Sequence, residues 1–359
     1  MNAILMISSA GFIATSLLSF WLSRRLSTTN ILIDTPNMRS SHVEATPRSG
    51  GIAIFIAWAL LLLICSVTYP FFSYADSFVF PNGFIALLLS SSLAFALGVF
   101  DDRYTLPARY KLVLQVFAAA IFVVLFGGLK HITLPLIGAT ELGAFGIAIG
   151  IFWIVALMNA FNFMDGLNGI AGIAAILVLA SLAIVCAGIG AFALAMVSGG
   201  LCFAITGFAW SNFPKGKIFL GDGGSLFIAF VIAILALLAT NAQEIFATEK
   251  RISALFVPIA FMPFLFDVAF TLVHRSMRGQ TVFDAHREHI YQLLTDLGVS
   301  HVGVTSLYVV MTLLCCGVAL CMENLPFQYQ WIAAIALAII FLFPSVLIFR
   351  RALRGKLLK

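Results

Sequence analysis

Apolar residues run along the chain in windows of about twenty, separated by short polar segments. Because a helix rises about 1.5 Å per residue, a window of this length can cross the hydrocarbon core of a bilayer. Eleven windows are predicted to span the membrane: residues 3–22, 50–69, 82–100, 112–129, 142–160, 167–188, 190–211, 224–241, 252–273, 303–322 and 329–349. The pattern therefore predicts an all-α fold, a polytopic transmembrane helix bundle of about eleven spans.

The sixth and seventh windows are the least clearly divided, because only residues 188–190 lie between them and none of these is charged. If the two windows formed one helix, every later segment would change sides. The basic residues favour the division: with eleven spans, seventeen Lys and Arg fall in one set of loops and three in the other. The positive-inside rule then puts the N-terminus outside and the C-terminus in the cytoplasm.

Composition agrees with a membrane protein. Of the 359 residues, 62% are hydrophobic and 10% are charged, whereas soluble domains carry roughly 25% charged residues. The net charge of +5 comes from the basic loops. No basic stripe with interleaved aromatic residues occurs, so no nucleic acid partner is expected. The first window lacks a basic segment before it and is long for the core of a signal peptide, which indicates a retained span.

The six cysteines lie in apolar windows without a CxxC or Cys/His pattern. This arrangement favours neither a disulfide framework nor a zinc site. No internal repeat, low-complexity segment or long linker divides the chain. We therefore predict a single integral membrane domain over residues 1–359.

The first predicted cytoplasmic loop contains the segments DTPNMRSSH and TPRSGG. Turn and helix-entry signals explain part of this loop, but they leave Arg39, His42 and Arg48 without a structural reason. Guanidinium groups bind phosphate through paired donors, and a glycine pair lets backbone N–H groups approach an anion closely. The loop is therefore a candidate for binding an anionic group.

The second such loop opens with Asp101 and Asp102, followed by Lys111. Adjacent carboxylates raise each other's proton affinity unless they share a cation or a proton. A divalent metal ion would meet that need. A solvated, charged loop is the alternative interpretation.

Two further junctions on the same side carry unusual polar residues. The fifth window ends in NAFNFMDGLNG, where Asn159 and Asn162 share a helix face and Asp165 follows one turn later. These side chains could converge on one ligand. The segment KIFLGDGGS places Asp222 in a glycine-rich turn before the eighth window, a pattern typical of phosphate binding.

The last cytoplasmic loop contains His286, Arg287 and His289. An interfacial amphipathic helix is the alternative interpretation of this segment. The HxxH spacing lacks the further ligands of a zinc site, and no serine nucleophile pattern occurs. The inner carboxylates, with basic residues and glycine turns nearby, indicate a site for Mg²⁺ and a diphosphate, since Mg²⁺ prefers few carboxylates plus phosphate oxygens.

These motifs resemble the polyprenyl-phosphate N-acetylhexosamine-1-phosphate transferases, the family that includes the peptidoglycan translocase and the initiators of O-antigen and exopolysaccharide lipid carriers. The resemblance runs from about Asp34 to Gln292 and rests on DTPNMRSSH with TPRSGG, GVFDD with KLVLQ, NAFNFMDGLNG, KIFLGDGGS and DAHREHIYQLL. It implies transfer of a sugar 1-phosphate from a UDP-N-acetylhexosamine to undecaprenyl phosphate, with release of UMP. The expected cofactor is Mg²⁺, with Mn²⁺ as a substitute.

By this resemblance Asp222 is the main metal ligand, with Asp102, Asp165 and Asn162 beside it. Asp101, Asp102 and Asp165 are the expected catalytic residues, and whether Asp101 acts as a base or an aspartate acts covalently stays open. The expected substrate-binding residues are Arg39, His42, Arg48, Lys111, Asn168, Phe219, His286, Arg287 and His289. Phe219 matches an aromatic residue that stacks on uracil.

Three positions depart from the peptidoglycan branch. Asn168 stands where that branch often has aspartate, and Thr105 stands where it often has lysine. His286 and His289 replace consecutive histidines, which disfavours a muramoyl-pentapeptide substrate and favours an O-antigen or exopolysaccharide initiator. The resemblance places the enzyme in the bacterial inner membrane with its site on the cytoplasmic side. The sugar is left open, and so is a homodimer.

A secondary transporter is the rival hypothesis from another class. Carboxylates near broken helices also mark coupling-ion sites at the middle of the membrane. In this chain the carboxylates fall at predicted helix ends, with only Asp267 inside an apolar window, and no inverted repeat is visible.

Overall fold

The structure is a computed structural model that describes residues 2–29, 31–34, 45–68, 82–135, 137–246, 248, 250–281 and 286–355. Most of these residues are helical, which confirms the predicted all-α class. The helices are α1 (Asn2–Leu26), α2 (Gly50–Thr68), α3 (Asn82–Tyr104), α4 (Ala108–Phe126), α5 (Ala144–Met164), α6 (Ile170–Gly188), α7 (Phe192–Asn212), α8 (Gly221–Thr240), α9 (Ala242–Ile245), α10 (Phe256–Ala260), α11 (Met262–Met277), α12 (Ile290–Asp296), α13 (His301–Met322) and α14 (Phe327–Arg354).

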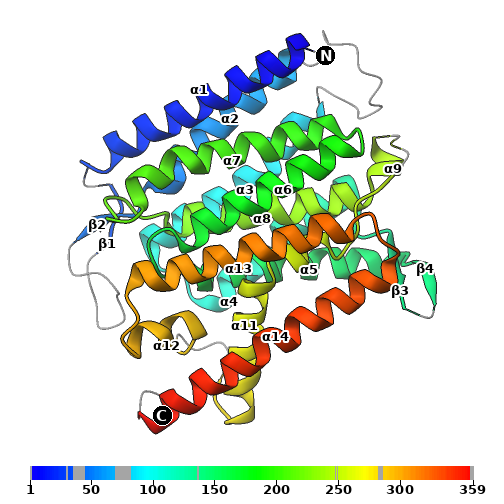
Figure 1. Cartoon of the computed structure of the whole chain (residues 1–359). Coiled ribbons are helices and arrows are strands. Elements are labelled where there is room, and N and C mark those ends of the chain that lie inside the picture. The colour runs from blue at the N-terminus through cyan, green and yellow to red at the C-terminus, as the bar shows by residue number, and fades with distance from the viewer. Residues whose placement is uncertain are drawn as a thin grey trace.

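Within the described residues, nine helices are long and apolar enough to cross a membrane, namely α2 to α8, α13 and α14. They coincide with nine of the predicted windows, and α1 coincides with the first. The polytopic architecture is therefore confirmed. The two ends of the chain lie at opposite ends of the bundle (Figure 1), as an odd number of crossings requires.

The ninth predicted span, residues 252–273, is not one continuous helix. The structure divides it into α10 and α11. Pro263 lies in the first turn of α11, and proline lacks an N–H group and clashes with the carbonyl of the fourth residue before it, so the helix cannot continue through this point. Helix α11 then runs across the direction of the other helices, towards the end of α14 (Figure 1).

The sixth and seventh spans are separate helices, as predicted. Helix α6 ends at Gly188 and α7 begins at Phe192. Between them Gly190 has a φ of 84°, a left-handed conformation that glycine adopts without a steric penalty. The two helices pack against each other along their length.

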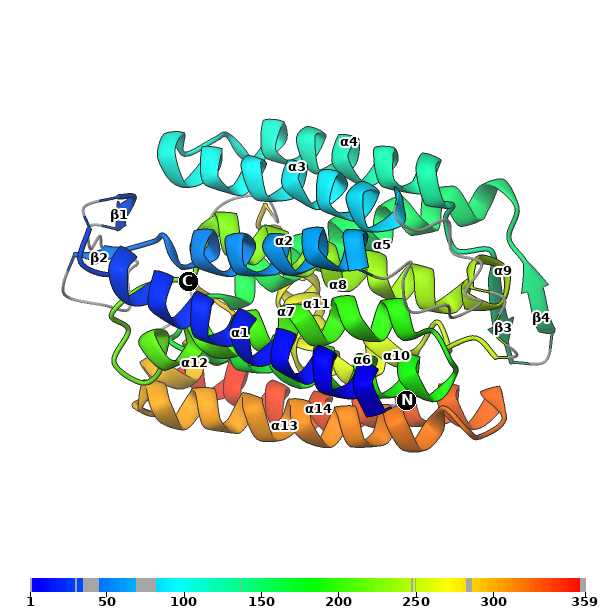
Figure 2. The same cartoon turned by 90° about the horizontal axis from the view of Figure 1, so that it is seen from above.

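Helix α8 forms the centre of the bundle. Nearly every residue from Gly223 to Thr240 is buried, and α2, α3 and α5 pack directly against it. Figure 2 shows α3 and α4 along one side of the bundle and α13 along the other, with α8 between them. A helix that is apolar on all faces is expected at such a position.

Two short antiparallel hairpins lie at opposite ends of the bundle (Figure 1). Strands β1 (Ile33–Asp34) and β2 (Thr46–Pro47) pair with Asp34 opposite Thr46. Strands β3 (His131–Leu134) and β4 (Gly138–Glu141) pair with His131 opposite Glu141. The first hairpin lies at the same end as the polar loops that the sequence singles out.

Helices α1 and α7 depend on a close approach at Gly207. A Cβ atom on this residue would lie 2.1 Å from the carbonyl oxygen of Ser16, so we expect Gly207→Ala to force the helices apart and to cost about 1–3 kcal/mol, as overpacking generally does. Gly317→Ala on α13 is the matched control, because its Cβ would meet open space. The melting temperatures of the detergent-solubilised variants test this, and equal values would contradict the packing.

Candidate active site

A cavity of about 300 Å³ opens at the end of the bundle that carries the β1–β2 hairpin. Its walls come from the ends of α3 and α5, the start of α8 and the segment around α12. The sequence-predicted residues that line it are Arg48, Asp102, Asn162, Asp165, Asn168, Phe219, Asp222 and Arg287. The structure thus brings together side chains from five polar segments that are far apart in sequence.

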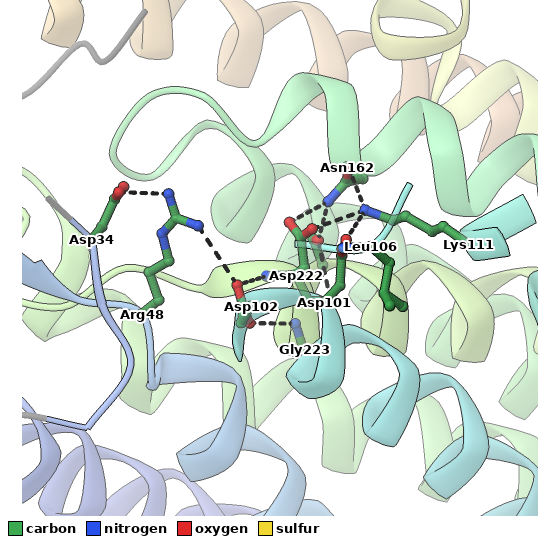
Figure 3. Close-up of polar contacts among 10 residues, drawn as sticks. Asp34, Arg48, Asp101, Asp102, Leu106, Lys111, Asn162, Asp222 and Gly223 are labelled. Carbon is green, nitrogen blue, oxygen red and sulfur yellow. Dashed lines mark hydrogen bonds and ion pairs between the residues drawn. The ribbon is translucent and has the colours of Figure 1, made fainter. Parts of the chain in front are cut away.

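Asp102 holds the start of α8. Its two carboxylate oxygens accept hydrogen bonds from the backbone N–H groups of Asp222, at 3.0 Å, and of Gly223, at 2.9 Å (Figure 3). The first N–H groups of a helix have no partner inside the helix, so a carboxylate there satisfies them and is attracted by the helix dipole. The Asp102 side chain is only 1% exposed. It is therefore engaged in structure, and its predicted role as a metal ligand stays a prediction.

Asp222 faces the cavity, with 32% of its side chain exposed. One oxygen accepts a hydrogen bond from the Asn162 amide at 2.8 Å. The other lies 2.8 Å from the ammonium nitrogen of Lys111 (Figure 3). Asp222 is therefore oriented from two sides and still accessible, as expected for a residue that binds a ligand.

Lys111 also binds Asp101, with 2.5 Å between its nitrogen and a carboxylate oxygen. The second oxygen of Asp101 accepts the N–H of Leu106 at 2.8 Å. The side chain of Asp101 is 8% exposed and does not line the cavity. The adjacent carboxylates predicted to share a cation thus point to different partners, Asp101 to Lys111 and Asp102 to the start of α8.

Arg48 provides a guanidinium group at the rim of the cavity. It forms an ion pair with Asp34 at 2.5 Å and lies 4.0 Å from Asp102. Burial works to lower the pKa of Arg48, but the hydrogen bond to Asp34 and the charges of Asp34, Asp102 and Asp222 outweigh it and raise that pKa. Arg48 therefore remains a cation that an anionic substrate can meet.

Asp165 lines the cavity, and among the described residues its carboxylate has no hydrogen bond or ion pair. Burial, and then the negative charges of Asp222 and Asp102, raise the pKa of Asp165 well above its ordinary value. A carboxylate kept without a partner at such a place is a candidate for binding a cation.

The wall around Phe219 and Asn168 is held mainly through the backbone. The N–H of Phe219 donates to the carbonyl of Pro47 at 2.8 Å, and its own carbonyl accepts the N–H of Gly50 at 2.9 Å. The Asn168 amide donates to the carbonyl of Pro214 at 3.3 Å. These bonds join Phe219 to the first loop and Asn168 to the segment after α7.

The predicted residues of the last loop separate into two groups. Arg287 lines the cavity and lies 3.1 Å from Asp296. His286 and His289 do not line it, and His289 is buried with its Nδ1 atom 3.3 Å from Asp267. Arg39 and His42 lie outside the described residues.

Some cavity residues were not among those predicted. They are Asp34, Asn212, Tyr291, Gln292, Thr295 and His301. Asn212 carried a signal that could have identified it, since it is a lone amide at the end of an apolar helix. The N–H of Gly169 donates to its oxygen at 2.7 Å, and its amide donates to the carbonyl of Ile218 at 2.9 Å. Thr295 and His301 carried no such signal.

The donor set of the cavity fits Mg²⁺. The described lining residues include four carboxylates, Asp34, Asp102, Asp165 and Asp222, and two guanidinium groups, Arg48 and Arg287. No group of three or more His, Cys, Asp and Glu in the described part of the chain is close enough to enclose a metal ion. Mg²⁺ commonly uses one or two carboxylates together with water and substrate phosphate oxygens, and Asp222 and Asp165 can supply these.

The family profile of glycosyl transferase family 4 matches residues 84–240, which run from α3 to the end of α8. An undecaprenyl-phosphate alpha-N-acetylglucosaminyl 1-phosphate transferase of Salmonella typhi is 27% identical over 92% of this chain and 87% of its own length. This chain is similar to members of glycosyl transferase family 4.

Two other similar proteins carry names of the same kind. A probable undecaprenyl-phosphate N-acetylglucosaminyl 1-phosphate transferase of Bacillus subtilis is 29% identical over 75% of the chain and 71% of its own length. A decaprenyl-phosphate N-acetylglucosaminephosphotransferase of Mycobacterium tuberculosis is 28% identical over 74% of the chain and 69% of its own length. The region that matches the family profile includes Asp102, Asn162, Asp165 and Asp222 but not α12.

We expect Asp165→Asn to stabilise the metal-free protein at neutral pH, by about 1 kcal/mol, which is the order of one pKa unit. The raised pKa of Asp165 means that the folded state binds its proton more tightly than the unfolded state. The ionised Asp165 side chain therefore lowers the free energy of unfolding at pH values above its pKa in the folded protein. This destabilisation disappears as the pH falls through that pKa.

Melting temperatures in EDTA, at neutral and at mildly acidic pH, measure this effect. The difference in melting temperature between Asp165→Asn and the wild type should be smaller at the mildly acidic pH. Glu141→Gln on β4 serves as the control, since Glu141 is exposed at the other end of the bundle. If Asp165→Asn melts at a lower temperature than the wild type at neutral pH, the Asp165 carboxylate does not destabilise the folded protein and the prediction is wrong.

Proposed function

We propose that this protein transfers an N-acetylhexosamine 1-phosphate from a UDP-sugar to undecaprenyl phosphate, releasing UMP and starting a lipid-linked cell-surface glycan. The observation that carries the proposal is the accessible Asp222, held by Lys111 and Asn162 in a cavity at the end of an apolar bundle. The relatives, named as transferases of N-acetylglucosamine 1-phosphate to undecaprenyl or decaprenyl phosphate, support the reaction class.

The reaction needs no redox partner. An oxygen of the acceptor phosphate attacks the phosphorus that carries the sugar, the bond from that phosphorus to the bridging oxygen breaks, and UMP leaves. The site must bring two anionic substrates together, so positioning and charge stabilisation are the main requirements. Bound Mg²⁺, the proposed cofactor with Mn²⁺ as a substitute, would neutralise charge on the diphosphate.

The residues of the chain then have distinct tasks. Lys111, fixed between Asp101 and Asp222, presents an ammonium group beside the acidic side of the cavity. Arg48, fixed by Asp34, presents a guanidinium group at the rim. Both cations suit phosphate oxygens. Asp222 and Asp165 are the proposed metal ligands.

Asp101 is proposed either as a base for the acceptor phosphate or as the group that orients the ammonium group of Lys111. Its contacts support the second task, because both of its oxygens already accept hydrogen bonds or an ion pair. A phosphate monoester has a second pKa of about 6, so at neutral pH it is largely ionised without a base. Phe219 and Asn168 are proposed to hold the uracil.

The proposed location is the bacterial inner membrane, with the cavity on the cytoplasmic side. Seventeen of the twenty Lys and Arg fall in the loops assigned to that side, as the positive-inside rule requires. UDP-sugars are cytoplasmic metabolites, so their site must open there. The proposed pathway role is that of an O-antigen or exopolysaccharide initiator, because the last loop has His286 and His289 where the peptidoglycan branch has consecutive histidines.

A secondary transporter is not favoured. Coupling-ion sites of such proteins lie near the middle of the membrane, whereas Asp101, Asp102, Asp165 and Asp222 all lie at helix ends. The relatives are transferases.

We expect purified protein to release UMP only when undecaprenyl phosphate, Mg²⁺ and a matching UDP-N-acetylhexosamine are all present. A panel of UDP-GlcNAc, UDP-GalNAc and their deoxygenated relatives identifies the sugar. If folded protein releases no UMP with any UDP-sugar of the panel, the proposal is refuted.

Asp222→Asn should lower UMP release by at least about 100-fold, because the amide removes the charge that the proposed metal needs. Glu244→Gln, which changes an acid at the opposite end of the bundle, should keep wild-type activity. Full activity in the Asp222 variant would exclude this residue as the metal ligand.

A further inference from the structure

Helix α11 contains a buried carboxylate that the proposed reaction does not use. Asp267 is 1% exposed and lies within the apolar stretch predicted as the ninth span. A carboxylate in such surroundings is costly unless several donors bind it. Its partners therefore show which parts of the protein it holds together.

Donors from two other segments, the start of α12 and α13, meet at this carboxylate. One oxygen accepts the N–H of Ile290 at 2.9 Å, and the other accepts the N–H of Tyr291 at 3.1 Å. The phenol of Tyr308 donates to the second oxygen at 2.5 Å. The Nδ1 atom of His289 lies 3.3 Å from the first. Asp267 thus joins α11 to α13 and caps the start of α12.

Helix α12 is a wall of the cavity. Tyr291, Gln292 and Thr295 all line it. The Tyr291 phenol donates to the carbonyl of Phe163 at 3.0 Å, and the Gln292 amide donates to the Tyr291 phenol at 3.0 Å. A Cβ on Gly166 would lie 2.0 Å from the Tyr291 oxygen. The position of α12 is therefore fitted closely to the end of α5, where Asn162 and Asp165 lie.

The opposite wall does not depend on Asp267. Asp222 is held by Lys111 and Asn162, and Asp102 holds the backbone of α8. None of these contacts involves α11, α12 or α13. A change at Asp267 should therefore move the α12 wall first, while the contacts that hold Asp102 and Asp222 stay in place.

We infer that Asp267 is a positioning residue for the sugar nucleotide: by capping α12 it sets the wall formed by Tyr291, Gln292 and Thr295 against the acidic wall of the cavity. This inference rests on the proposed function. It assigns to Asp267 an effect on donor binding rather than on the reacting groups.

Asp267→Asn is the main test, because asparagine has the same size but cannot accept from all three of Ile290, Tyr291 and Tyr308. We expect KM for the UDP-sugar to rise by about tenfold or more, the scale of a hydrogen bond to a charged group, while kcat changes less than threefold. Amide hydrogen exchange should become faster in residues 290–296 and stay unchanged in α8. Tyr308→Phe removes one donor and should give a smaller change in the same direction.

The matched control is Glu323→Gln. Glu323 is also a largely buried acid that accepts a backbone N–H, from Ser253 at 2.8 Å, but it lies in the loop between α13 and α14, at the end of the bundle opposite the cavity. It should leave KM and exchange in α12 unchanged. If Asp267→Asn does not fold, Tyr308→Phe carries the test.

The outcomes separate the two proposals. An unchanged KM in both variants, or a fall in kcat alone, would overturn the positioning role. A wild-type protein that releases no UMP with any donor would instead refute the proposed function, while exchange in α12 of the Asp267 variant would still show whether Asp267 caps that helix.

Discussion

The structure depends on how the first backbone N–H groups of a buried helix find hydrogen-bond partners where no water is present. Helix α8 lies at the centre of the bundle, and its first N–H groups have no partner in their own helix. Asp102 supplies both of its oxygens to them. Glycine at position 98 lets α3 approach, since a Cβ there would lie 2.2 Å from the Asp222 carbonyl oxygen. The bond from α3 to α8 thus places Asp222 in the cavity.

A second carboxylate binds the start of a helix in the same way. Asp267 accepts the first N–H groups of α12, as Asp102 accepts those of α8. In both cases a nearly buried carboxylate from one helix fixes the start of another, and the second helix forms a wall of the cavity. Asp102 and Asp267 therefore hold walls of the cavity, whereas Asp165 and Asp222 face the cavity itself.

This division explains how the site tolerates so much negative charge. Lys111 balances Asp101 and Asp222, and Arg48 balances Asp34. Asp165 has no such partner among the described residues, and its pKa is raised by burial and by its acidic neighbours. Such a residue lowers the stability of the protein without its ligand, which is a common property of functional sites. A bound cation would remove that cost, because it restores the balance of charge.

The sequence by itself determined the class of fold, most spans and the set of polar loops that meet at one end of the bundle, because apolar length and loop polarity are local properties. It also singled out Asp222, Asn162, Asp165 and Arg48, which line the cavity, since polar residues at apolar helix ends stand out. Only the tertiary structure decided that Pro263 breaks the ninth span, that Asp102 caps α8, and that His289 packs against Asp267 while Thr295 and His301 face the cavity. These features depend on which segments meet in space, and one residue's chemistry does not reveal its partner.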